Sequence, residues 1–357
     1  MTVLYCLPFL VYHLNQSFVA NDSSTSYRCE MLKELRLNYN AFSGNFPTEI
    51  AKITGLVDFD GDYAFKTRGT DTRPIVSEIL EMPNLAGLTL WSVAMEGSIE
   101  HVQFSSSLVY LRLGKNYING TLPPSTWELS YLVSLDVRSN RFSGTFPSQM
   151  GNLVSLQDFI IEGNRFSGSL PSEIGNLKQL VRLNTFQNSL SGSLPPSLGY
   201  LTSLRYIRVD NNEFSGTIPT TLALATSVTS IQLNENAMEG TIPPDLANLP
   251  LLIHFGVAFN AFSGTIPSFA ACTTCETVSL NDNHFTGVVP PLPPTVKIVE
   301  FSSNRLTGTI PSSLFTSSFS LQVIFSNNSL TGTLPGLLST TITILKVTLS
   351  VFIRREI

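Results

Sequence analysis

The chain carries few charges, and this shortage limits what it binds. Charged residues make up 13% of its 357 residues, and the formal net charge is −5. A nucleic-acid-binding protein shows a basic stripe on one face, whereas positive and negative residues are mixed along this chain. We therefore expect no nucleic-acid partner. Low charge together with many Ser, Thr and Asn residues is more typical of an extracellular protein than of a cytosolic one.

Long apolar runs are also missing. Outside the N-terminal segment no stretch reaches the roughly 18 apolar residues that a membrane-spanning helix needs, so we predict no transmembrane span. The run TITILKVTLSVFI is shorter, contains Lys346 and fits a last strand better. Residues 3–12 are nearly all apolar and precede a polar stretch, a pattern that resembles a secretory signal. We predict a signal over residues 1–20 and a cap region over 21–31; the alternatives are a ragged first coil or a misplaced start codon.

Signatures of catalysis are absent as well. None of the four histidines stands beside a Ser or Cys nucleophile pattern, and the chain has no P-loop. The acidic run DFDGD, residues 58–62, resembles a calcium loop, but Tyr63 stands where that loop requires Gly. We interpret the run as a solvated acidic turn. The sequence predicts no enzyme activity, no cofactor and no metal.

Cysteine is scarce, with four residues in all. Cys272 and Cys275 form a CxxC pair, and both stand where other copies of the repeat carry Leu. We favour two buried, small apolar residues, with a local disulfide as the alternative. A zinc site would need two more ligands at a suitable spacing, and none follow. Cys6 and Cys29 would tie an N-terminal cap together only in a chain that keeps residues 1–20.

What the sequence does contain is one phrase that returns at a nearly fixed period. NRFSG at residue 140 recurs 24 residues later, and the same Asn recurs along most of the chain. Each Asn is followed by a Gly after four residues and a Pro after seven, as at Gly144 and Pro147. Such a period indicates a solenoid whose coils pack only on their neighbours. The Asn positions are Asn40, Asn116, Asn140, Asn164, Asn188, Asn212, Asn236, Asn260, Asn283, Asn304 and Asn328.

Each copy predicts the same local structure. In LVSLDVRSN, residues 132–140, apolar residues alternate with polar ones, which indicates a short strand with one buried face. A strand this short must pair with the next copy in a parallel sheet. The Asn amide bonds the backbone groups of adjacent coils, and we predict a ladder of them that includes Asn116, Asn140, Asn164, Asn188, Asn212, Asn236 and Asn260. The apolar residue that follows, Phe in many copies, predicts an aromatic spine. The run from Pro back to Leu predicts a 3₁₀ or helical turn.

Weaker copies complete the repeat. Two degenerate coils occupy residues 56–100, with Val93 and Ala64 at the Asn place, and one more occupies residues 340–357. We count fourteen copies and predict one solenoid domain over residues 32–357.

The core LxxLxLxxN is identified as a leucine-rich repeat, and its continuation NxFSGxIPxxLGNLxxL resembles the plant-type subclass. That subclass is found in receptor-like proteins, receptor-kinase ectodomains and polygalacturonase inhibitors, and similar repeats occur in protist surface antigens. The resemblance implies an α/β solenoid: a right-handed superhelix of about fourteen coils of 21–29 residues, with a parallel β-sheet on its concave face.

Without catalytic groups, the function must lie in exposed side chains. Strand positions four and two residues before each Asn place should face outward. Large apolar residues there, with arginines beside them, are typical of interface hot spots. The predicted binding residues are Trp91, Arg112, Arg138, Ile160, Glu162, Phe186, Arg208 and Asp210. The alternative is that single exposed aromatics and solvated ion pairs are ordinary surface.

These residues lead us to expect a non-catalytic recognition module, outside the cell or on its surface, that binds a protein, peptide or glycan, with a signalling co-receptor as a further candidate partner. Two alternatives stay open: an inhibitor of a secreted hydrolase, and an intracellular, cytoplasmic scaffold. Candidate glycosylation sites for a secreted chain are Asn21, Asn119 and Asn327.

Overall fold

The computed structural model describes residues 32–42, 45–46, 48–65, 72–312, 314, 321–332 and 342–346. The chain forms two compact units, residues 1–167 and 168–357. The predicted signal over 1–20, the cap region over 21–31, Cys6, Cys29 and Asn21 lie outside the described residues.

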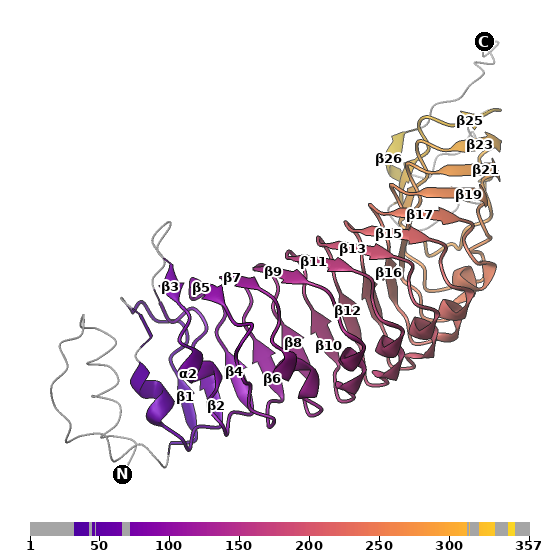
Figure 1. The fold of residues 1–357 in the computed structure, drawn as a ribbon. Helices are drawn as coiled ribbons and strands as arrows, with labels where there is room; N and C mark the ends of the chain where they lie inside the picture. Colours follow the sequence, from indigo (N-terminus) through magenta and orange to yellow (C-terminus); the bar gives the residue numbers. More distant parts are fainter. Residues whose placement is uncertain are drawn as a thin grey trace, which may run out of the picture. The chain divides into compact units, whose positions relative to one another are not determined.

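Each copy of the repeat contributes one short strand to a parallel sheet, here called the first sheet (Figure 1). Partner strands are shifted by one copy of the repeat, so that Leu111 lies beside Leu135 and Leu135 beside Phe159, and the pairing of β24 with β26 has a register shift. The first unit supplies β1 (Glu34–Arg36), β2 (Asp58–Asp60), β4 (Gly87–Thr89), β6 (Tyr110–Arg112), β8 (Ser134–Asp136) and β10 (Asp158–Ile160). The second unit supplies β12 (Arg182–Asn184), β14 (Tyr206–Arg208), β16 (Ser230–Gln232), β18 (His254–Gly256), β20 (Thr277–Ser279), β22 (Ile298–Glu300), β24 (Leu321–Ile324) and β26 (Ile342–Lys346). These fourteen strands match the fourteen predicted copies, including the degenerate ones.

A second parallel sheet follows the Asn places, and the sequence reasoning missed it. There the stretch that starts just after the Asn, as in RFSG at 141–144, is itself a strand. The first unit has β3 (Arg73–Pro74), β5 (Met95–Ser98), β7 (Tyr117–Gly120), β9 (Arg141–Gly144) and β11 (Arg165–Gly168). The second has β13 (Ser189–Gly192), β15 (Glu213–Gly216), β17 (Ala237–Gly240), β19 (Ala261–Thr265), β21 (His284–Val288), β23 (Arg305–Gly308) and β25 (Ser329–Leu330). One apolar residue between small polar ones gives too short an alternation to signal a strand.

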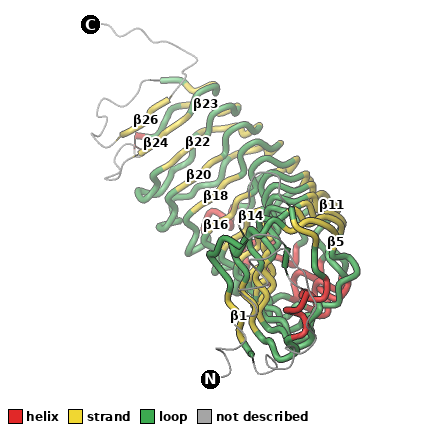
Figure 2. Tube along the Cα trace, turned by 90° about the vertical axis from the view of Figure 1, so that its left-hand side faces the viewer, coloured by secondary structure: helices red, strands yellow, loops and turns green. Residues whose placement is uncertain are grey.

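Short helices close the coils, as predicted. Most begin directly after the repeat Pro, because its fixed φ and missing N–H suit the start of a helical turn. Figure 2 draws them in red. They are the 3₁₀ helices η1 (Thr48–Lys52), η2 (Pro124–Glu128), η3 (Ser148–Asn152), η4 (Ser172–Asn176), η5 (Pro196–Tyr200), η6 (Thr220–Leu224) and η7 (Pro244–Asn248), and one α-helical turn, α2 (Ser77–Leu80).

The core of each unit is a stack of Leu, Ile, Val and Phe side chains. The predicted aromatic spine forms as short stacks rather than one continuous column. Phe142 and Phe166 are stacked with centroids 6.1 Å apart, and Phe262 and Phe285 with centroids 6.3 Å apart. In the second unit, Leu190, Met238, Leu306 and Leu330 stand where other copies carry Phe.

The repeat Asn amides bridge neighbouring coils. Asn140 accepts a hydrogen bond from the Ile118 N–H at 3.0 Å and donates to the Leu113 and Val137 carbonyls at 2.8 and 3.0 Å. Each amide thus satisfies backbone groups that the coil corner leaves without partners. Equivalent bonds to the preceding coil are made by Asn116, Asn164, Asn212, Asn236 and Asn260, and Asn188 donates to the Thr185 carbonyl of its own coil.

The residue before each Asn place has a left-handed backbone. Its φ lies between 51° and 57° in twelve coils, although none of these residues is Gly. We call this set the rim column. It consists of Tyr39, Tyr63, Ser92, Lys115, Ser139, Gln187, Asn211, Glu235, Phe259, Asp282, Ser303 and Asn327. The left-handed turn lies where the chain leaves the first sheet for the second.

Candidate functional site

Trp91 is the centre of a cationic and aromatic cluster on the first unit. Its indole Nε1 donates a hydrogen bond to the Tyr63 hydroxyl at 2.9 Å. Its ring lies over Gly114, where any Cβ would clash with it. The Arg138 guanidinium carbon is 5.1 Å and the Lys115 Nζ 5.6 Å from the ring centroid, within cation–π range. Trp91 is therefore half-buried and held on several sides.

Arg138 is also part of the fold. It binds Asp136 in a bidentate manner, with Nε–Oδ1 at 2.9 Å and Nη2–Oδ2 at 2.6 Å, and Glu162 lies 3.6 Å from its Nη1. Asp136 is only 5% exposed. The hydrogen bond that Arg138 donates to Asp136 raises the pKa of Arg138. Because removing the guanidinium would leave a buried carboxylate without its cation, Arg138 cannot serve as a surface probe alone.

Ile160 departs from the sequence prediction. Alternation along β10 predicts an outward, exposed side chain, but Ile160 is 7% exposed and belongs to the buried core. Equivalent positions on paired parallel strands lie only about 4.8 Å apart, so neighbouring side chains shield one another. The partner of Ile160 on β8, Asp136, is shielded in the same way. Ile160 is therefore removed from the candidate contact surface.

Tyr110 and Arg112 form an accessible pair on the first unit's face. The Arg112 guanidinium carbon lies 5.3 Å from the Tyr110 ring centroid, and Tyr110 is 43% exposed. Further along the same unit, Tyr39 and Tyr63 stack at 5.4 Å with an interplanar angle of 12°. Exposed tyrosines beside arginines are the usual anchors of protein interfaces.

On the second unit, the predicted residues Phe186, Arg208 and Asp210 lie together. The Arg208 guanidinium carbon is 4.0 Å from the Phe186 centroid, and its Nε is 3.6 Å from Asp210 Oδ1. Burial raises the pKa of the Asp210 carboxyl, and the nearby charge of Arg208 only partly opposes this. Asp210 Oδ1 is buried and accepts no hydrogen bond.

This geometry gives a pH-dependent prediction for Asp210→Asn. A folded-state pKa above the ordinary value means that the protonated form stabilises the fold, and that this contribution is lost as the pH rises through the folded pKa. The neutral amide imitates the protonated form. We expect a higher thermal midpoint than the parent chain at about pH 7, with the difference vanishing below about pH 4. Melting curves across this range test it against Glu239→Gln, an exposed carboxylate; a lower midpoint at neutral pH would contradict it.

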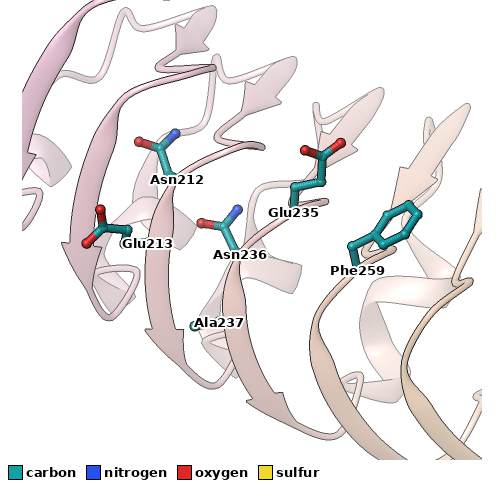
Figure 3. A pocket seen from close by; sticks show the side chains of 6 residues that line it. All are labelled: Asn212, Glu213, Glu235, Asn236, Ala237 and Phe259. Carbon is teal, nitrogen blue, oxygen red and sulfur yellow. The ribbon is translucent and has the colours of Figure 1, made fainter.

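A separate pocket of about 540 Å³ opens on the second unit, where the rim column meets the second sheet. Figure 3 shows its six lining side chains, which come from three successive coils. They are Asn212, Glu213, Glu235, Asn236, Ala237 and Phe259. Of these, the sequence pattern marked Asn212 and Asn236 as members of the Asn ladder, and none of the six as a binding residue. The pocket depends on left-handed rim residues, which no sequence pattern marked.

Cys272 and Cys275 are free and buried, so no disulfide joins them; a hydrogen bond to Cys272 and burial raise the pKa of the Cys275 thiol. Asn119 and Asn327 are exposed. Within the described ranges, no group of His, Cys, Asp or Glu is arranged to hold a metal ion. The helices of the same ranges include none long and apolar enough to cross a membrane.

Comparison with known proteins supports the repeat assignment. A family model described as Leucine Rich Repeat matches residues 131–153, 155–177 and 203–224. A search of curated protein sequences found no match.

Several solved structures resemble the chain. The crystal structure of a TDR receptor has a TM-score of 0.74 and 29% identity, covering 85% of this chain and 52% of that one. A second similar structure is the leucine-rich repeat ectodomain of the plant membrane receptor kinase GASSHO1/SCHENGEN3 from Arabidopsis thaliana, in complex with CASPARIAN STRIP INTEGRITY FACTOR 2. Its TM-score is 0.69 and its sequence identity 26%, and the match covers 86% of this chain and 40% of that one. The plant peptide hormone receptor RGFR1 in complex with RGF2 has a TM-score of 0.62 and 26% identity, and the match covers 86% of this chain and 61% of that one.

The chain thus spans between 40% and 61% of the length of these receptors. The predicted fold class, an α/β leucine-rich repeat solenoid with a parallel sheet along one face, is confirmed in both units. The repeat, the sheets and these likenesses together identify the chain as a leucine-rich repeat solenoid similar to the ectodomains of plant receptors.

Proposed function

We propose that this chain is a non-catalytic recognition module that acts outside the cell or at its surface and binds a peptide segment on the outward face of its first sheet. The observation that carries the proposal is the exposed pair Tyr110 and Arg112 beside the Trp91 cluster. A peptide that docks on such side chains pays little ordering cost, because short paired strands already hold them in place.

The resemblance to a peptide hormone receptor in complex with RGF2 favours a peptide over a glycan. The resemblance to a receptor-kinase ectodomain favours an extracellular place. A co-receptor would then be a second partner. Two alternative functions remain: an inhibitor of a secreted hydrolase and an intracellular scaffold. The identity of a selected ligand distinguishes these functions from that of a peptide receptor.

The test is selection of peptides from a displayed random library on the immobilised chain, followed by calorimetric titration of a selected peptide. The double variant Tyr110→Ala/Arg112→Ala removes an aromatic and a cationic anchor. We expect it to bind the peptide about tenfold more weakly or worse, since interface anchors contribute about 2 kcal/mol or more. Its free energy of unfolding should stay within about 1 kcal/mol of the parent, because both side chains are exposed.

Tyr131→Ala is the matched control, because Tyr131 is a 68% exposed tyrosine that lies outside both sheets. It should bind the selected peptide normally. Unchanged affinity in the double variant, or an equal loss in the control, would show that this face is not the binding surface.

A further inference from the structure

We infer that the pocket lined by Glu213, Glu235 and Phe259 receives the side chain of an arginine residue of a peptide ligand. The inference rests on the proposed function only in taking the arginine to be part of a peptide. The residues that line the pocket belong to the second unit, whereas Tyr110 and Arg112 belong to the first.

Charge selects a cation. Two of the six lining residues are the carboxylates Glu213 and Glu235, and none is basic. Both are exposed. Glu235 Oε2 accepts a hydrogen bond from Asn211 Nδ2 at 2.7 Å, which orients the carboxylate and leaves acceptor capacity on it. An anionic ligand would meet two like charges here, whereas a cation would be attracted by both.

The two asparagines of the pocket have their hydrogen-bonding groups already engaged. Asn212 Oδ1 accepts from the Leu190 N–H at 3.0 Å, and its Nδ2 donates to the Thr185 carbonyl at 2.9 Å. Asn236 makes the corresponding bonds to Phe214 and Val209. The amides that line the pocket are therefore neutral and already hydrogen-bonded, and the carboxylates are its strongest acceptors for a ligand donor.

Phe259 supplies the apolar wall. It is 51% exposed although it is a large aromatic residue, and both Phe259 and Glu235 belong to the rim column, with φ of 54° and 52°. In Figure 3 the two side chains stand on neighbouring coils at one edge of the pocket, with Glu213 at the other edge. A planar group that lies against the ring can thus reach carboxylates with its edge.

A guanidinium fits this arrangement better than an ammonium. It is planar, stacks on aromatic faces and presents several N–H donors along its edge, which suits one ring and two carboxylates. A pocket of about 540 Å³ is within the range of small-ligand sites and accommodates the aliphatic stem as well. Lysine would keep the charge but lose the stacking and the paired donors.

The experiment uses N-acetyl-arginine amide as the probe, so that no natural ligand has to be known. It is titrated into the full isotope-labelled chain, and backbone amide chemical shifts are followed. We expect saturable shifts at Glu213, Glu235 and Ala237. N-acetyl-citrulline amide, which has nearly the same shape without the charge, should bind at least about tenfold more weakly, since charge-assisted bonds are about twice as strong as neutral ones.

Two variants assign the binding to these groups. Glu213→Gln/Glu235→Gln keeps the side-chain shapes and should weaken probe binding about tenfold or more. Glu239→Gln removes one exposed carboxylate on β17 that does not line the pocket, and should leave binding unchanged. Phe259→Leu should weaken the arginine probe more than N-acetyl-lysine amide, because only the guanidinium stacks on the ring.

Absence of saturable shifts at the pocket, equal binding of the citrulline probe, or an equal loss in Glu239→Gln would overturn the inference. Failure of the proposed function looks different. Suppose that the arginine probe binds the pocket but that no selected peptide depends on Tyr110 and Arg112. The inference about the pocket is then supported, and the proposal that a peptide binds the first sheet of the first unit is contradicted.

Discussion

Phe166→Ala is expected to lower the free energy of unfolding by about 3–5 kcal/mol, the typical cost of removing a buried aromatic ring. Phe166 is 2% exposed, stacks on Phe142 and lies 5.0 Å from the ring of Phe146. The alanine leaves a void between coils that a closely packed stack cannot refill. Denaturant unfolding followed by circular dichroism measures the loss.

The matched control is Phe259→Ala, which removes a ring that is 51% exposed. Its unfolding midpoint should change little, because surface substitutions cost about 0.5 kcal/mol or less. If Phe166→Ala unfolds at the same denaturant concentration as the parent chain, the stacked rings do not stabilise the solenoid, and our account of the core is wrong.

Asn140→Ala is expected to lower the free energy of unfolding by about 2–4 kcal/mol. The substitution leaves several backbone groups without hydrogen-bond partners, and each unsatisfied buried group costs about 1–3 kcal/mol. The Ile118 N–H loses its acceptor, and the Leu113 and Val137 carbonyls lose a donor. Besides a lower midpoint, the Ile118 amide should exchange its hydrogen faster. Asn140→Asp keeps the acceptor for Ile118 and should protect that amide better than alanine does, while still losing the donated bonds.

Asn152→Ala provides the comparison in the same unit. Asn152 is exposed and donates a single bond, to the Trp127 carbonyl at 3.3 Å. It should lower stability much less and leave the Ile118 amide unaffected. Equal losses for the two alanine variants would mean that the Asn at the strand end contributes no more than a surface amide.

The repeat made the architecture predictable. The alternation that ends at Asn140 indicates one strand per copy, and the recurrence of Gly and Pro after it indicates turns and helical returns. Even the degenerate copies form strands, Asp58–Asp60 and Gly87–Thr89, because their apolar residues keep the same spacing although the Asn is gone.

The site was less predictable, for reasons that single residues make plain. Alternation assigns Ile160 to the correct side of its strand, but it carries no information on how far neighbouring side chains cover that side. Arg138 looks like a surface charge in the sequence, yet its partner Asp136, two residues away, is buried. The pocket requires Glu213, Glu235 and Phe259, which come from three successive coils, to lie close together. Glu235 and Phe259 have a left-handed backbone, and because neither is Gly, the sequence gives no sign of that conformation.

The rim column also limits which amino acids these positions can exchange. None of its twelve residues is Val, Ile or Thr, the β-branched types for which a left-handed backbone is a true outlier. Substitutions at the rim positions are therefore restricted to unbranched, aromatic and small polar residues. A designer who wished to give the solenoid a new specificity would vary these sites within that set and leave the coils themselves untouched.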